Sequence, residues 1–260
     1  MKLFNKIVAV IDDMGAGIQF LGLILRTGMR TPCTVHQVFE QIWYVTIQSL
    51  PTTALAGFFV GSIMTIQFTM QILEFGALGY LGGLSTSATV REIGPLLIAF
   101  MLSGKVGAFT SAELGTMRVT EQIDAIRCLG ANPLQEIILP RFLGIIFSSF
   151  FLLSVGLLMS IFGGMLLGIL FSGINSAEYL RHIPNIVNPS SVGLGLFKCL
   201  IFAFVLASIC TYKGYFTSGG ARGVGKSVVS TAVLTMVGIV VMDWLTSLVG
   251  EALLNIFLES

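Results

Sequence analysis

The chain has 260 residues, of which 55% are hydrophobic and only 10% are charged, and its formal net charge is +1. Soluble domains carry about a quarter charged residues, so this composition excludes a soluble globular protein and predicts an all-α protein with several membrane spans. The basic residues are spread along the chain, which argues against nucleic-acid binding. The cysteines have no metal-ligand or disulfide spacing, so we expect no metal site and no cofactor in this chain. They are Cys33, Cys128, Cys199 and Cys210.

The first predicted element is an amphipathic helix over residues 3–25. Its apolar residues recur at helical spacing, but Asp12 and Asp13 leave too few consecutive apolar residues for a membrane span. The two acidic residues also argue against a cleavable signal peptide. We expect this helix to lie in the membrane interface, followed by Arg26 and Arg30 at the cytoplasmic headgroups.

Five later stretches are apolar enough to cross a bilayer. The uncharged segment 41–73 would make a helix of about 50 Å, too long for one straight crossing. We therefore expect an interfacial approach up to residue 50, a break or kink at Pro51, and the first span after it. The five predicted spans are 52–73, 94–113, 142–171, 192–212 and 228–250.

Three features of the spans and their connections add to this outline. Gly57 and Gly61 in the first span, and Gly164 and Gly168 in the third, have the small-residue spacing that allows close helix packing. The Gly- and Ser-rich segment 76–88 is predicted to be a non-cytoplasmic loop with a short helix. An exposed loop with a helical turn is predicted over 172–191.

A charged amphipathic helix is predicted over 117–129, between the second and third spans. Its apolar residues form a narrow stripe, charges of both signs lie elsewhere, and Gly130 ends it. Such a helix suits docking into a groove on a soluble partner. The alternative is a plain connector with a solvated face.

The distribution of basic residues predicts the orientation of the spans. With the N-terminus inside, the outer side holds only Arg91 and Arg181, and Lys198 falls within a span. The remaining eleven of the 14 basic residues lie on the cytoplasmic side, which is decisive under the positive-inside rule. Five spans then place the C-terminus outside. These eleven are Lys2, Lys6, Arg26, Arg30, Lys105, Arg118, Arg127, Arg141, Lys213, Arg222 and Lys226.

Residues 220–227, GARGVGKS, match the phosphate-loop pattern G-x-x-x-x-G-K-[ST]. That motif works when a buried strand precedes it and a helix of a soluble α/β domain follows it. Predicted membrane spans flank it here, so we interpret the segment as a flexible basic loop at the inner headgroups. Intramembrane serine chemistry is also disfavoured, because His36 and His182 both fall outside the spans.

Charged residues near or inside the spans are the remaining candidates. Arg91 and Glu92 stand at the outer end of the second span, where an interface anchor and a lipid-phosphate site are equally good interpretations. Lys198 lies about 9 Å below the outer end of its span, and Asp243 about 22 Å above the inner end of the next. In a core about 30 Å thick these depths agree, which predicts an intramembrane ion pair.

The motifs in the middle of the chain resemble the MlaE-type permease family. The resemblance is carried by Arg91–Pro95 (REIGP), by Ala112–Ala125 (AELGTMRVTEQIDA), by Asn132–Leu134 and by Pro140–Arg141. It implies a single permease domain over 1–260, the membrane subunit of an ABC transporter that moves phospholipid or another lipid between bacterial membranes. It also implies a homodimer in the inner membrane, two separate ATP-binding subunits, MCE-domain lipid-binding subunits and, in some systems, a small STAS-domain protein. The chain itself would not be an enzyme.

The resemblance also assigns roles to individual residues. It places five of them at the wall of a lipid cavity: Arg91, Glu92, Met64, Ile72 and Phe75. It places five others in a coupling helix that contacts the ATP-binding subunit: Glu113, Arg118, Glu121, Gln122 and Asp124. The alternative function, from the residues alone, is an ion-coupled secondary carrier that uses Lys198 and Asp243.

Overall fold

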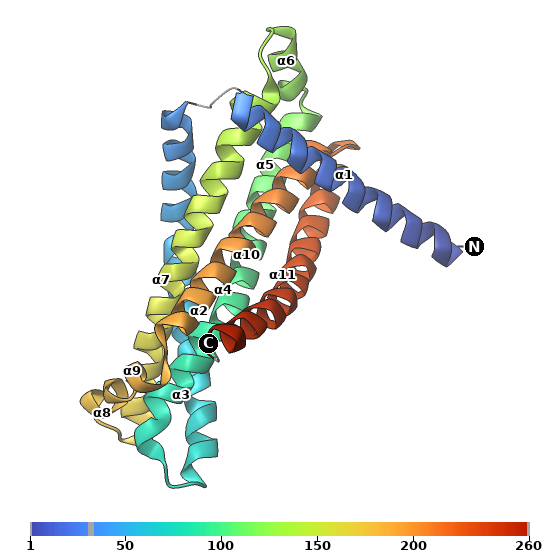
Figure 1. Cartoon of the computed structure of the whole chain (residues 1–260). Coiled ribbons are helices and arrows are strands. Elements are labelled where there is room, and N and C mark those ends of the chain that lie inside the picture. The colour runs from blue at the N-terminus through green and yellow to red at the C-terminus, as the bar shows by residue number, and fades with distance from the viewer. Residues whose placement is uncertain (1, 31–33, 259–260) are drawn as a thin grey trace. The chain divides into compact units, whose positions relative to one another are not determined.

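The computed structural model of this chain describes residues 2–30 and 34–258, so Cys33 lies outside the described part. Figure 1 shows that this part is built from helices, and within it there is no strand. The longer helices are α1 (Lys2–Arg30), α2 (Val35–Leu73), α4 (Gly94–Leu102), α5 (Ala108–Val119), α7 (Leu139–Ser172), α10 (Pro189–Tyr215) and α11 (Gly220–Leu258). The shorter ones are α3 (Leu81–Ala88), α6 (Gln122–Cys128), α8 (Ser176–Arg181), α9 (Ile183–Ile186) and the 3-10 turn η1 (Leu78–Tyr80).

Five helical stretches in this part of the chain are long and apolar enough to cross a membrane. The predicted fold class, an all-α membrane protein, is therefore confirmed. Most stretches extend beyond the predicted spans, because polar residues at their ends continue the helix. The five are Val35–Leu73, Leu78–Val119, Leu134–Ser172, Pro189–Tyr215 and Gly220–Gly250.

Pro51 does not break the first of these helices, so of the predicted break or kink the break is excluded. α2 is one helix from Val35 to Leu73 with Pro51 inside it. The hydroxyl groups of Thr52 and Thr53 both donate to the carbonyl of Ser49, at 2.9 and 2.8 Å. Serine and threonine side chains next to a proline keep the surrounding backbone hydrogen-bonded, which is why membrane helices tolerate the missing N–H.

Three five-residue π turns interrupt the α-helical hydrogen bonding. They are η2 (Thr89–Ile93), η3 (Ser103–Gly107) and η4 (Leu134–Ile138). At the end of η2, the N–H of Gly94 donates to the carbonyl of Thr89, five residues earlier. Pro95 follows directly and has no N–H for the carbonyl of Arg91, so a widened turn fits this position.

Segment 76–88, predicted as a loop with a short helix, is more helical than expected, and segment 220–227, predicted as a flexible loop, is helical. Segment 76–88 forms η1 and α3, and α3 continues through η2 into α4. Residues 220–227 form the first two turns of α11 rather than a flexible loop. Gly219 and Gly220 both have positive φ, so Gly220, the first glycine of the motif, lies at the helix start, while Gly223 and Gly225 lie within α11.

The predicted helix over 117–129 is also wrong, because the chain turns within it. α5 ends at Val119, α6 begins at Gln122, and Glu121 between them has a φ of 60°. The side chains of Thr116 and Thr120 donate to backbone carbonyls four residues earlier, a pattern that weakens a helix. The sequence carries no glycine or proline here to signal the turn.

The chain packs as two compact units, which are described separately. Unit 1 contains Met1–Val45, Ser103–Phe147 and Phe204–Thr235. Unit 2 contains Thr46–Leu102, Ser148–Ala203 and Met236–Ser260. Four long helices, α2, α7, α10 and α11, contribute a segment to each unit.

Unit 2 is held by very close packing of α2 against α7. A β-carbon added at Gly61 would lie 1.8 Å from the carbonyl oxygen of Ser160, and one at Gly57 would lie 2.1 Å from that of Gly156. The predicted close contact at Gly57 and Gly61 is therefore confirmed, because no larger side chain fits there. Figure 1 also shows α8 and α9 beside α3, where the buried Tyr179 hydroxyl meets Ser85 at 3.0 Å.

Unit 1 holds α1 against the end of α10. Phe20 of α1 packs between Tyr212, Tyr215 and Phe216, with ring centroids 5.2–5.9 Å apart. Asp13 accepts hydrogen bonds from Tyr212 at 2.9 Å and from Lys213 at 2.5 Å. The opposite side of α1 exposes Ile18 and other large apolar residues, as expected for a helix in an interface. The predicted stripe between residues 3 and 11 lies outside the described side chains.

Candidate functional site

A buried lysine in unit 2 lies at the centre of the charged residues there. Lys198 of α10 is fully buried, and its ammonium donates to Glu92 Oε2 at 2.7 Å and to Ser247 Oγ at 2.8 Å. Asp243 Oδ1 stands 3.0 Å from the same ammonium, without hydrogen-bond alignment. The structure thus brings Lys198 and Asp243 together.

Glu92 also belongs to this cluster, although the sequence argument, which compared the depths of Lys198 and Asp243, did not include it. It comes from η2, where the wide turn precedes Pro95, and it also accepts from Ser247 at 3.2 Å. With one lysine and two carboxylates in their ordinary charge states, the cluster carries a net charge of −1. The sequence signal was present in Arg91-Glu92 itself, but helical periodicity cannot follow a face through a π turn.

The other predicted lipid-binding residues lie in different surroundings. Arg91 is partly buried beside Glu92 in η2. Ile72 is buried in a cluster with Leu81, Ile174 and Tyr179, whereas Met64 is buried in α2 and Phe75 is 81% exposed. The lipid-binding role of these five residues stays a prediction.

The predicted coupling residues form a charged network around the turn between α5 and α6. Arg118 donates to both oxygens of Asp124, at 2.7 and 2.8 Å. Arg127 also donates to Asp124, at 3.3 Å, and to the Tyr215 hydroxyl. Residues six apart do not meet on one straight helix, so the Arg118–Asp124 bond depends on the turn at Glu121.

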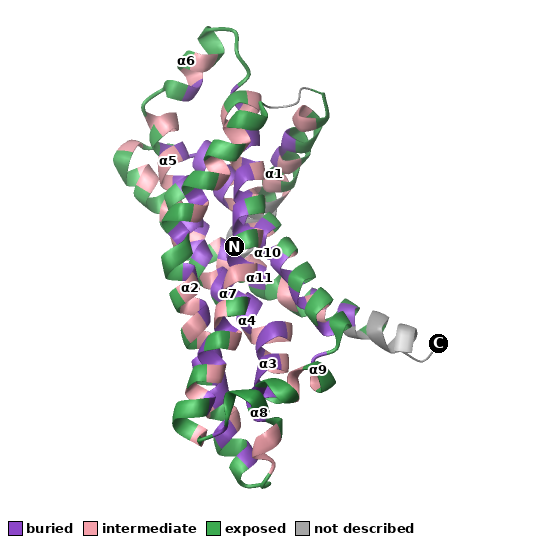
Figure 2. Ribbon diagram, turned by 90° about the vertical axis from the view of Figure 1, so that its left-hand side faces the viewer, coloured by how far each residue is buried: buried purple, intermediate pink, exposed green. Residues whose placement is uncertain are grey.

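Of the other three predicted coupling residues, one forms an ion pair and two are exposed. Glu113 accepts from Arg141 at 2.7 Å, which ties α5 to the start of α7. Glu121 and Gln122 are exposed and have no hydrogen-bonded side chain among the described residues. Figure 2 shows α6 as mostly exposed, and Ile123 is its buried residue. Glu121 and Gln122 are thus available to a partner, whereas Asp124 is occupied by two arginines.

In unit 1, the contact between α1 and α10 lowers the pKa of Asp13. Burial raises the pKa of Asp13, but hydrogen bonds from Lys213 and Tyr212 outweigh that effect and hold the pKa below its ordinary value of 3.8. Asp13 is therefore ionised near neutral pH and pairs with Lys213. Within the described residues, no group of histidine, cysteine and acidic side chains is arranged to hold a metal ion.

Residues 38–249 match the family model described as Permease MlaE. A probable ABC transporter permease protein of Rickettsia conorii is 33% identical over 241 residues, which is 93% of each chain. A probable ABC transporter permease protein of Synechocystis is 32% identical, over 82% of this chain and 81% of the relative. The chloroplast protein trigalactosyldiacylglycerol 1 of Arabidopsis thaliana is 30% identical, over 85% of this chain and 67% of its own.

The family match and the relatives agree with the motifs between Arg91 and Arg141, and each covers far more than half of the chain. The structure adds five helices in the described residues that are long and apolar enough to cross a membrane. This chain therefore belongs to the MlaE family of ABC transporter permeases.

Proposed function

We propose that this permease moves phospholipid between the inner and outer membranes of a bacterium, driven by ATP that a separate subunit hydrolyses. The observation that carries the proposal is the family match over residues 38–249. The name of the Arabidopsis relative refers to a lipid, trigalactosyldiacylglycerol, which supports a lipid as substrate. The ion-coupled carrier loses its main argument, because Lys198 already has two carboxylate partners and ABC permeases use ATP.

In the proposed assembly, two copies of this chain form a homodimer in the inner membrane. Two ATP-binding cassette subunits contact the cytoplasmic side, and MCE-domain subunits, with or without a STAS-domain protein, complete the transporter. The N-terminus is cytoplasmic and the C-terminus periplasmic. The basic residues support this orientation, since eleven of the 14 fall on the cytoplasmic side.

A transport assay tests the function. The chain, reconstituted with its ATP-binding subunits, should transfer labelled phospholipid between vesicles only when ATP is present. The chain alone should be inert under a proton or sodium gradient. Gradient-driven transport by the chain alone would instead revive the carrier function.

The phospholipid site is proposed at Arg91 and Glu92. Arg91 can offer paired N–H donors to a phosphate. Arg91→Glu should reduce phospholipid retained per protein after detergent purification, because a phosphate would lose a donor and meet a like charge. Arg181→Glu is the matched control, since it reverses the other basic residue predicted on the outer side. Equal retention in the two variants would make Arg91 an interface anchor only.

The coupling contact is proposed at the exposed residues beside the α5–α6 turn. Glu121→Lys reverses an exposed charge that has no internal partner among the described side chains, so it should weaken capture of the ATP-binding subunit and leave this chain folded. Glu178→Lys, an exposed acid in α8, is the control. Asp124→Lys is less informative because it also breaks two internal arginine bonds.

A further inference from the structure

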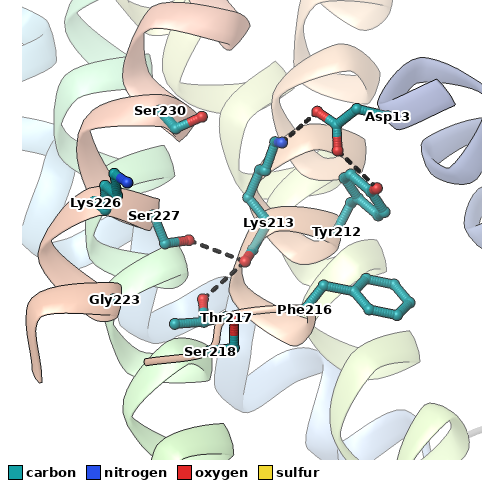
Figure 3. Close-up of a pocket in the computed structure, with 10 residues that line it drawn as sticks. All are labelled: Asp13, Tyr212, Lys213, Phe216, Thr217, Ser218, Gly223, Lys226, Ser227 and Ser230. Carbon is teal, nitrogen blue, oxygen red and sulfur yellow. Dashed lines mark hydrogen bonds and ion pairs between the residues drawn. The ribbon is translucent and has the colours of Figure 1, made fainter. Parts of the chain in front are cut away.

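Unit 1 contains an open pocket of about 340 Å³ at the junction of α10 and α11. Figure 3 shows its lining, which comes from α1, from the end of α10 and the turn after it, and from the first turns of α11. The residues that line it are Asp13, Tyr212, Lys213, Phe216, Thr217, Ser218, Gly223, Lys226, Ser227 and Ser230. The volume lies within the range of small-ligand sites.

Part of this lining is already engaged in internal hydrogen bonds. Lys213 donates to Asp13, and the backbone carbonyl of Lys213 accepts from Thr217 at 2.8 Å and from Ser227 at 2.9 Å. Tyr212 also donates to Asp13. These contacts fix the shape of the pocket and neutralise Asp13.

Three hydrogen-bond donors of the pocket lining are not engaged in these internal contacts. Lys226 is exposed and makes no ion pair with the described residues, and the hydroxyls of Ser218 and Ser230 have no hydrogen-bond partner within that same part of the chain. Counting the ordinary charges, Asp13 contributes −1 while Lys213 and Lys226 contribute +1 each. The pocket therefore has a net positive charge, with one ammonium and two hydroxyls available to a ligand.

The lining is chemically suited to a phosphate group. An ammonium and hydroxyls are donors that phosphate oxygens accept, and charge-assisted bonds of this kind are stronger than neutral ones. The exposed Phe216 adds an apolar edge. The start of α11 contributes a partial positive charge, although the side chains carry the argument.

The pocket does not work as a phosphate loop, even though Gly223, Lys226 and Ser227 belong to that sequence motif. A phosphate loop wraps its backbone N–H groups around the ligand. Here the same residues are helical, and the N–H of Gly223 donates to the carbonyl of Gly219. Recognition must therefore come from side chains, which suits a single phosphate better than a nucleotide triphosphate.

We propose that this pocket binds the phosphate group of an anionic ligand, with Lys226 as its cation and Ser230, one helical turn further along α11, as a hydroxyl donor. Two sources offer that group: the headgroup of an anionic phospholipid in the surrounding bilayer, and soluble inorganic phosphate. This site is separate from the one at Arg91 and Glu92. It does not depend on the transported substrate.

The test uses the full-length chain in phosphatidylcholine nanodiscs, as the unaltered protein and as Lys226→Gln. One arm adds phosphatidylglycerol to the nanodiscs and counts retained phosphatidylglycerol by native mass spectrometry. The other arm measures binding of inorganic phosphate by equilibrium dialysis. Arg222→Gln is the matched control, because it removes one positive charge one helical turn earlier, at a residue that does not line the pocket.

Lys226→Gln should weaken binding in one arm by about tenfold, the effect of losing one charge-assisted hydrogen bond, whereas Arg222→Gln should change it little. The arm that responds identifies the source of the phosphate. Ser230→Ala should give a smaller loss in the same arm. An equal loss in both charge variants, or no loss in Lys226→Gln, would overturn the proposal, as would absence of binding by the unaltered protein. Size-exclusion profiles establish that every variant is folded.

Discussion

Each unit contains a paired lysine, with two carboxylates in unit 2 and one in unit 1, and the surroundings of the two lysines differ. In unit 2, Lys198 is fully buried and contacts Glu92, Asp243 and Ser247. In unit 1, Lys213 is 19% exposed and contacts Asp13, which is 42% exposed. The difference lies mainly in the lysine, because Glu92 is 39% exposed, nearly as much as Asp13, whereas Lys198 itself is fully buried and Asp243 is 16% exposed.

This difference determines what each pair contributes. A buried charge without its partner is strongly destabilising, whereas exposed pairs contribute little because water and salt screen them. We therefore expect the Lys198 cluster to contribute strongly to the stability of unit 2. The Lys213 pair positions α1 and shapes a pocket, and it can be lost at small cost.

The largest expected effect is from Lys198→Ala. Two carboxylates would remain near each other without a cation, and the free energy of unfolding should fall by about 3–5 kcal/mol. The yield of monodisperse protein and its thermal melting would measure the loss. Lys213→Ala is the matched comparison and should melt close to the unaltered protein. Similar losses in both variants would abolish the distinction between the two clusters.

A second prediction compares the contributions of Asp243 and Glu92 to stability. Asp243→Asn removes the net negative charge of the cluster and leaves Glu92 on Lys198, so it should change the unfolding free energy by about 1 kcal/mol or less. Removing both charges, with Glu92→Gln added, should produce a much larger loss because the lysine is then unpaired. The measurement is again thermal melting.

The charge swap with Asp at 198 and Lys at 243 should recover little stability, because the new aspartate would face Glu92. The sequence alone, which considers Lys198 and Asp243 as an isolated pair, predicts partial recovery. A swap that melts like the unaltered protein would mean that Glu92 contributes nothing to the cluster.

A smaller effect is expected at the exposed pair. Asp13→Asn removes the charge that Lys213 contacts, and the loss should be about 0.2–1 kcal/mol. Hydrogen exchange of α1 amides would measure it as faster exchange near Phe20, with exchange around Lys198 unchanged. Asp12→Asn is the control, since Asp12 is the exposed neighbour of Asp13 in α1. Faster exchange throughout the protein would contradict a local role.

The smallest effect concerns pH. The pKa of Asp13 is lowered in the folded protein, so the stability that it contributes is present above its ordinary value of 3.8 and is lost as the pH falls through the lowered pKa. Protection of α1 should therefore stay constant between about pH 5 and 8. Loss of α1 protection within that range would show that another group controls the contact.

Sequence reasoning predicted the fold class, the number of spans and the meeting of Lys198 with Asp243, since all three follow from hydropathy and from counting residues along helices. It failed where backbone hydrogen bonding departs from the α-helical pattern. The turn at Glu121 has no glycine to signal it, and Pro51 is tolerated by neighbouring hydroxyls. Glu92 escaped the depth argument because a π turn changes which face it occupies.

The π turn at Thr89–Ile93 has a consequence for how this protein can change during evolution. A π turn holds one residue more than an α turn, so it corresponds to a single inserted residue within a helix. Deleting one residue there would narrow the turn, but Pro95 would still supply no N–H to the carbonyl before it, which favours the wider turn. Arg91 and Glu92 stand on this insertion. A one-residue insertion or deletion at this turn would therefore change the direction in which these two charges point.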